Sequence, residues 1–313
     1  MKILSFNCIQ IVISLSFILS CTSASAQWPQ WRGPLRDGIS KEKNLLKVWE
    51  AEGPRLIWSV DTVGDGFSST AIQNNMVYTT GKRDSVEILT ALDLKGNLKW
   101  QKVFGRASKE KDWPQARCTP TVYKNKVYAI SVFGDIACFD SKSGKIIWKE
   151  KDFSGEPFVP LVNNNQIYFP GAYKKGGKFC SWNEDLNKRS VIWQDTVSAN
   201  PLGGAVLLDN KIIVPGNNRG LVCLDLNTGK LLSHYDRISY STLMVADNML
   251  YCYEDRTGKV YLFRMNGNNL ELVSSFKITA GTGPRIAHMS IANGLLFIRH
   301  GKVLMAYDLK QQS

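Results

Sequence analysis

The chain has 313 residues, 44% of them hydrophobic, with a formal net charge of +12. This length suffices for one large domain or two smaller ones, and the composition is ordinary for a globular protein, so a disordered chain is excluded. Seven cysteines without Cys-x-x-Cys spacing exclude a disulfide framework and a zinc site.

Residues 1–26 are predicted to be a secretory signal peptide. The apolar core Ile9–Leu19 is too short to span a bilayer, and Ala24-Ser25-Ala26 fits a cleavage site before Gln27. The alternative is lipoprotein processing at Cys21, but the residues before it fit that pattern poorly. The sequence therefore favours a soluble periplasmic or secreted protein without a transmembrane segment. In such a protein a basic surface favours acidic partners over nucleic acid, or simply aids solubility.

Residues 27–54 precede the repeated part of the chain and carry Trp28, Trp31 and Arg32. Two exposed tryptophans would promote aggregation in an exported protein, so we expect this segment to pack on the fold that follows. The alternative is a segment that docks a partner.

A unit of four short strands is clearest in Thr119–Glu150. β-branched and aromatic residues in short runs, separated by Asn, Gly, Asp and Ser, are typical of strands joined by tight turns. The expected strands are Thr119–Tyr123, Val127–Phe133, Ile136–Asp140 and Lys145–Lys149. One such sheet cannot bury both faces, so it needs neighbours like itself.

The unit repeats along the chain at intervals of roughly 40–50 residues. Its first turn recurs around Asn75, Asn125, Asn165, Asn210, Asn248 and Asn293. Its fourth strand ends on Trp100, Trp148 and Trp193, whereas the fourth copy has Ser233 and the fifth has lost the tryptophan.

The sixth copy stops before its fourth strand. Arg55–Val60, which carries Trp58, supplies the missing strand from the other end of the chain. Radial repetition of four-stranded units predicts an all-β fold, a β-propeller of six blades over 55–313, closed by Arg55–Val60. A monomer is expected.

Propeller topology predicts which residues meet. The connections into the first strands and the turns between the second and third strands lie on one face, here called the mouth. We expect it to bind an anionic or polar extended ligand, with Arg117, His288 and Arg299 nearest the axis. The other candidates are Phe67, Arg219, Tyr240 and His300. The alternative is that the arginines pair with acids or with backbone carbonyls.

No catalytic residue is predicted. Three histidines without His-x-His or HExxH spacing give no metal site, and there is no nucleophile elbow or phosphate-binding glycine loop. Asp93, Asp140 and Asp225 each open a tight turn, so we interpret them as caps of backbone N–H groups rather than as a carboxylate pair.

The repeat and the N-terminal stretch from Gln27 to Pro34, QWPQWRGP, resemble the PQQ-like β-propeller repeat family. That family includes quinoprotein dehydrogenases and a non-enzymatic propeller lipoprotein of outer-membrane protein assembly. The resemblance implies a binding platform for an envelope protein or ligand, or a PQQ-dependent alcohol or sugar dehydrogenase. Six blades rather than seven or eight, no Cys-Cys pair and no match to the calcium ligands favour the platform, without PQQ or another cofactor.

Overall fold

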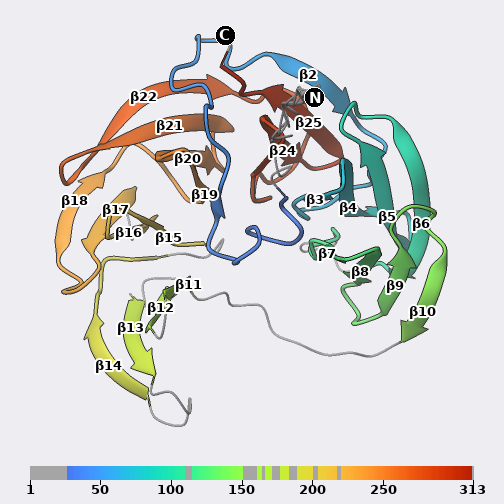
Figure 1. Cartoon of the computed structure of the whole chain (residues 1–313), viewed down its shortest axis with the longest axis horizontal. Coiled ribbons are helices and arrows are strands. Elements are labelled where there is room, and N and C mark those ends of the chain that lie inside the picture. Colours follow the sequence, from blue (N-terminus) through green and yellow to red (C-terminus); the bar gives the residue numbers. More distant parts are fainter. Residues whose placement is uncertain are drawn as a thin grey trace, which may run out of the picture.

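The computed structural model describes residues 27–109, 115–150, 161–163, 166–170, 177–182, 189–199, 204–216 and 220–311. Within these ranges, five four-stranded sheets and one five-stranded sheet are arranged around a central axis, each with the first strand of its repeat towards that axis (Figure 1). The described ranges contain no helix, and hence none long and apolar enough to cross a membrane. The predicted all-β propeller with six antiparallel blades is confirmed.

The strands of the first three sheets follow the chain. The first sheet contains β3 (Ala71–Gln73), β4 (Met76–Arg83), β5 (Val86–Asp93) and β6 (Leu98–Arg106). The second contains β7 (Thr121–Tyr123), β8 (Lys126–Ile130), β9 (Ile136–Asp140) and β10 (Ile146–Glu150). The third contains β11 (Leu161–Asn163), β12 (Gln166–Pro170), β13 (Gly177–Trp182) and β14 (Arg189–Gln194).

The last three sheets include strands from the N-terminal part. The fourth contains β15 (Val206–Leu208), β16 (Lys211–Pro215), β17 (Leu221–Asp225) and β18 (Leu231–Tyr235). The fifth contains β19 (Ser241–Ala246), β20 (Met249–Glu254), β21 (Lys259–Asn266) and β22 (Asn269–Lys277), with β1 (Ile39–Ser40) added parallel to β19. The sixth contains β23 (Ser290–Ala292), β24 (Leu295–His300), β25 (Val303–Asp308) and β2 (Leu56–Val60). Since β2 pairs antiparallel with β25, the N-terminal strand completes the last sheet as predicted.

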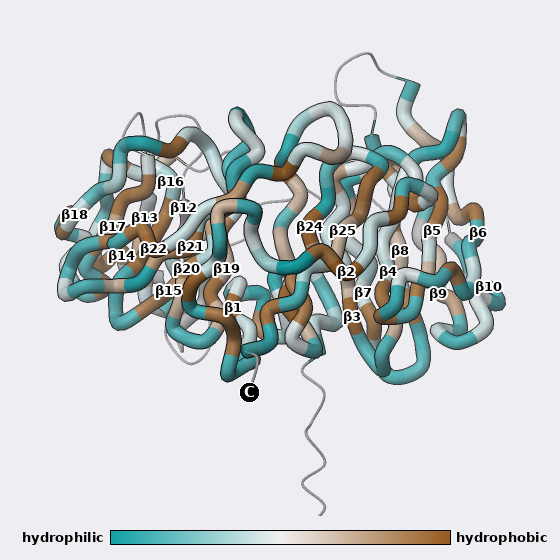
Figure 2. Tube along the Cα trace, turned by 90° about the horizontal axis from the view of Figure 1, so that it is seen from above, coloured by the Kyte–Doolittle hydropathy of each residue, from teal (hydrophilic) through white to brown (hydrophobic). Residues whose placement is uncertain are grey.

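The first turn of most sheets has the backbone that its residues predict. Both central residues have positive φ at Asn74-Asn75, Asp209-Asn210, Asp247-Asn248 and Asn293-Gly294. Asparagine, aspartate and glycine tolerate this conformation, which matches the twist of a two-residue hairpin. The predicted turn at Asn165 lies outside the described residues. Along the chain, hydrophobic strands alternate with hydrophilic turns, which lie at both faces of the ring (Figure 2).

One predicted turn is longer than expected. Strand β8 ends at Ile130 instead of Phe133, because residues 131–135 form a wider turn than the predicted Gly134-Asp135 pair. The Ser131 N–H donates to the Asp135 carbonyl at 2.8 Å, and the Asp135 N–H donates to Ser131 Oγ at 3.0 Å. The Asp135 side chain is thereby turned towards Arg106 of β6, a contact between sheets that local sequence does not reveal.

Fourth-strand tryptophans join neighbouring sheets. The Trp100 indole N–H donates to the Ser141 carbonyl of the second sheet at 3.0 Å, and its ring lies against Gly144, which leaves no room for a Cβ there. Trp58 and Trp193 make the same contact, with the Leu94 and Leu226 carbonyls. Each acceptor follows one of the turn-opening aspartates. Their carboxylates accept backbone N–H groups inside the turn, as predicted; Asp140 Oδ1, for example, is 2.8 Å from the Ser143 nitrogen.

Trp148 differs from its counterparts. Its side chain is 39% exposed, whereas Trp100 and Trp193 are 8% and 9% exposed. Its ring contacts Tyr128 of its own sheet at a centroid distance of 6.1 Å. The same pairing joins Tyr78 to Trp100, Tyr168 to Trp193 and Phe297 to Trp58.

The fifth sheet obtains its tryptophan from the N-terminal segment. Its fourth strand has Ser274 at the place where four of the sheets have tryptophan, since Ser274 pairs with Leu262 as Trp100 pairs with Ala91; the fourth sheet has Ser233 there. The Trp49 ring centroid lies 5.7 Å from that of Tyr251, and the backbone N–H of Trp49 donates to Ser274 Oγ at 2.9 Å. Trp49 therefore replaces the missing residue.

The rest of the N-terminal segment connects several sheets. Trp28 exchanges backbone hydrogen bonds with Ile72 at 2.7 and 2.9 Å, and Val122 donates its N–H to the Pro29 carbonyl. Further along, the Glu42 carboxylate accepts the Gly294 N–H at 3.1 Å. The segment thus crosses the face opposite the mouth (Figure 1). The boundary at residue 54 stays a prediction, and Trp49 shares its hydrophobic core with Tyr251 of β20 and Leu304 of β25.

We predict that Trp49→Ala lowers the free energy of unfolding by about 3–5 kcal/mol, because a buried indole is removed without replacement. Urea unfolding followed by circular dichroism measures this change. Trp148→Ala is the matched control, since Trp148 is 39% exposed whereas Trp49 is 6% exposed, and it should cost less. Equal losses for the two variants would contradict the role given to Trp49.

Candidate functional site

The connections and turns that were predicted to form the mouth lie together on one face of the ring. Asp65, in the connection into β3, exchanges backbone hydrogen bonds of 2.7 and 2.8 Å with Lys82 near the end of β4. The connection before β15 behaves similarly, since the Ala199 N–H donates to the Pro215 carbonyl of β16 at 2.9 Å. The connections into first strands and the turns between second and third strands therefore meet, as the topology predicted.

Arg299 lies deep beneath this face. Its side chain is 2% exposed. Nε donates to the Gly301 carbonyl at 2.9 Å, Nη1 to Thr79 Oγ1 at 2.8 Å, and Nη2 to the Gly64 carbonyl at 2.8 Å. Burial lowers its pKa to about 10, against the opposing charge of Asp65. Because every guanidinium nitrogen donates to a protein oxygen, Arg299 joins β24 to the first sheet rather than facing a ligand.

The two predicted histidines are buried as well. The His300 ring nitrogens lie 2.7 Å from the Ala280 carbonyl and 2.8 Å from the Gly283 carbonyl, so the ring fixes the connection into β23. His288 is 6% exposed, and its ring lies edge-on to Trp31 at 4.9 Å between centroids. The centre of the ring is thus reached by the N-terminal segment.

Arg32 of that segment is also buried near the axis. Its Nε donates to the Arg36 carbonyl at 3.2 Å, and its Nη2 to the Asp37 carbonyl at 2.9 Å and to the Ala205 carbonyl. Burial lowers its pKa to about 10, against the opposing effect of the Asp37 charge. The bond to the Ala205 carbonyl, just before β15, holds the segment against the fourth sheet.

The remaining candidates do not form one pocket. Arg117 is exposed, Tyr240 is half-buried and Phe67 is buried. Arg219 lies outside the described residues. The seven predicted residues therefore divide into a buried centre and an exposed rim, and the ligand that they were expected to bind stays a prediction.

An exposed aromatic side chain lies in the mouth turn of the second sheet, the sheet whose first strand follows Arg117. Phe133, in the turn between β8 and β9, is 47% exposed and lies 5.2 Å beneath the Arg106 guanidinium. Arg106 also pairs with the buried Asp135 at 3.3 Å. Burial raises the pKa of Asp135, but hydrogen bonds from Arg106 outweigh it and hold that pKa below its ordinary value.

Glu87 is a buried acid that the sequence reasoning missed. It lies in β5 with 1% exposure, and its Oε1 accepts the Val132 N–H of the second sheet at 2.9 Å, while Oε2 has no partner. Burial raises its pKa to about 7; Asp135 adds to the rise, and the charges of Arg117 and Lys82 oppose it. The sequence feature that could have revealed it is the position of an acidic residue among the apolar residues of a strand.

The described residues show no cluster of acids for a calcium ion beside a quinone, and the absence of that cofactor stays a prediction. No group of three His, Cys, Asp or Glu side chains within the described ranges could hold a metal ion. Hydroxyls around the axis bond within the fold: Ser69 Oγ donates to the His288 carbonyl at 2.6 Å, and Thr70 Oγ1 bonds to Ser290 Oγ. We therefore derive no step through such a cofactor.

We predict that Arg299→Lys lowers the free energy of unfolding by about 3 kcal/mol, because several buried carbonyls lose their donor. Chemical denaturation at fixed pH measures the loss. Arg264→Lys, in an exposed pair with Glu271, should change stability by less than about 1 kcal/mol. A similar small effect at Arg299 would contradict its structural role.

Glu87→Gln should change how stability depends on pH. The folded-state pKa of about 7 lies above the ordinary value of 4.5, so this group's contribution to the free energy of unfolding decreases as pH rises between these values. Above pH 7 the variant should be more stable than the parent by on the order of 2 kcal/mol. Unfolding titrations from pH 5 to pH 8 test this, and parallel curves for the two proteins would refute it.

Comparison with known proteins supports the repeat. Residues 83–180 match a family model described as outer membrane protein assembly factor BamB. A search of curated protein sequences finds no match.

Several solved structures are similar to this chain at low identity. BamB from Moraxella catarrhalis is 16% identical over 77% of this chain and 71% of its own, with a TM-score of 0.38. A europium-containing methanol dehydrogenase is 14% identical over 88% of this chain and 68% of its own, with a TM-score of 0.34. Quinohemoprotein alcohol dehydrogenase from Comamonas testosteroni is 14% identical over 87% and 57%, with a TM-score of 0.33. The predicted resemblance of the repeat to the PQQ-like β-propeller family is confirmed by the family match.

Proposed function

We propose that this protein is an exported, non-enzymatic propeller that binds a protein partner in the cell envelope. The observation that carries the proposal is the division of the mouth. Arg299 and His300 are buried and bonded within the fold, whereas Arg117 and Phe133 are exposed at the rim. A partner that approaches the mouth therefore meets a rim of arginine and aromatic side chains.

Such a rim suits a protein better than a small ligand. Arginine and aromatic residues are enriched among the anchors of protein interfaces, whereas small ligands need concave sites that bury most of their surface. The net charge of +12 favours an acidic partner. The match to an outer membrane protein assembly factor supports an envelope protein as the partner class.

The experiment is affinity capture from an envelope fraction with the full chain, exported by its own leader. Arg117→Ala/Phe133→Ala should lose most of the captured partner. The matched control is Tyr123→Ala/Lys124→Ala, because Lys124 lies 5.5 Å from the exposed Tyr123 ring in a first turn, on the opposite face.

Two outcomes would refute the proposal. Capture that is equal for both double variants would show that the rim is not used. Dye-linked alcohol oxidation after addition of PQQ and calcium would favour the dehydrogenase that the family resemblance also allows.

A further inference from the structure

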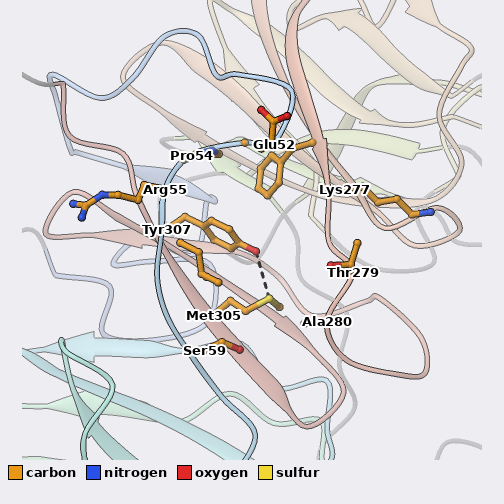
Figure 3. Close-up of a pocket in the computed structure, with 12 residues that line it drawn as sticks. Glu52, Pro54, Arg55, Ser59, Lys277, Thr279, Ala280, Met305 and Tyr307 are labelled. Carbon is orange, nitrogen blue, oxygen red and sulfur yellow. Dashed lines mark hydrogen bonds between the residues drawn. The ribbon is translucent and has the colours of Figure 1, made fainter.

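A pocket of about 360 Å³ opens between the fifth and sixth sheets, at the outside of the ring (Figure 3). The end of β22 provides Phe276 and Lys277, and β25 provides Met305 and Tyr307. Glu52 and Ser59 come from the N-terminal segment and β2. The pocket therefore lies where β2 and β25 meet the fifth sheet, and Thr279 and Ala280, at the start of the connection into β23, also line it.

Its floor continues a row of aromatic rings. Phe276 lies edge-on to Trp49 at 5.4 Å and to Tyr307 at 5.2 Å. Met305 lies beside Tyr307 and adds a polarisable thioether, which contacts aromatic rings favourably. The floor is thus suited to a flat aromatic group.

The Tyr307 hydroxyl gives this floor a hydrogen-bond acceptor. It donates its one proton to Met305 Sδ at 3.4 Å, and Figure 3 shows this bond at the side of the hollow. Burial raises the pKa of Tyr307 to about 12, so the hydroxyl stays neutral. Its oxygen lone pairs remain for a donor, which an indole has and a phenyl ring lacks.

The rim carries charges of both signs. Arg55 is held by Asp308 at 2.7 Å. The side chains of Glu52 and Lys277 are exposed, and neither makes a hydrogen bond or ion pair with another described residue. Residues that flank an inserted side chain would therefore find one acidic and one basic group, which suits a polypeptide segment.

We propose that this pocket takes a tryptophan side chain of the protein partner, with the indole against Phe276 and Tyr307 and its N–H donated to the Tyr307 hydroxyl. The chain uses the same chemistry internally, since Trp58, Trp100 and Trp193 each fill a seam and donate to an oxygen of the neighbouring sheet. The identity of the occupant as a partner's side chain rests on the proposed function.

The test uses N-acetyltryptophanamide as the probe and saturation-transfer NMR on the full mature chain. Ser59→Phe fills the pocket from its exposed edge and should abolish transfer to the indole protons. Ser85→Phe, an equally exposed position in the turn between β4 and β5, is the matched control and should leave transfer intact. Tyr307→Phe should remove the preference for N-acetyltryptophanamide over N-acetylphenylalaninamide while leaving the melting temperature nearly unchanged.

Transfer that survives Ser59→Phe, or that is equal for N-acetylleucinamide, would overturn the site. Envelope capture separates this result from the proposed function. If Ser59→Phe captures the partner as well as Ser85→Phe does, the pocket is not the partner's site, although the binding platform stands. If no variant and no parent chain captures a protein, the proposed function itself fails.

Discussion

The ring depends on one hydrogen bond made repeatedly, from an indole N–H on a fourth strand to a backbone carbonyl in the next sheet's turn. A four-stranded sheet leaves both faces in need of cover. The indole buries a large apolar area and satisfies a carbonyl that the turn leaves exposed. The aspartate that opens the same turn caps its N–H groups, so these three seams are apolar and their turns are hydrogen-bonded.

Loss of that tryptophan is compensated from outside the repeat. In the fifth sheet Trp49 packs on Tyr251, and the Leu46 N–H donates to the Leu309 carbonyl, which corresponds to the indole acceptors of other seams. The N-terminal segment therefore supplies packing and a hydrogen bond that the repeat itself lacks at this seam. Its passage across the face opposite the mouth also brings Trp31 and Arg32 to the axis, and the proposed recognition surface is therefore the rim.

Sequence reasoning succeeded where the determinants are local. Asn75 and Asn248 predict tight turns through their own backbone preferences, and the spacing of Trp100 and Trp148 predicts the repeat. It could not separate buried from exposed arginines, because Arg299 is satisfied by residues of the first sheet that are distant in sequence. Glu87 was missed for the same reason, since its partner Val132 belongs to the next sheet.

The pairing of β2 with β25 sets the order in which this molecule can be completed. Strand β2, near the start of the fold, cannot pair until β25, the last strand, has been made, since Val60 pairs with Leu304. Contacts between such distant positions form slowly and leave apolar surface exposed meanwhile. A growing chain therefore carries Trp58 without its sheet until Val303–Asp308 have been made, so the end that is made first stays incomplete longest.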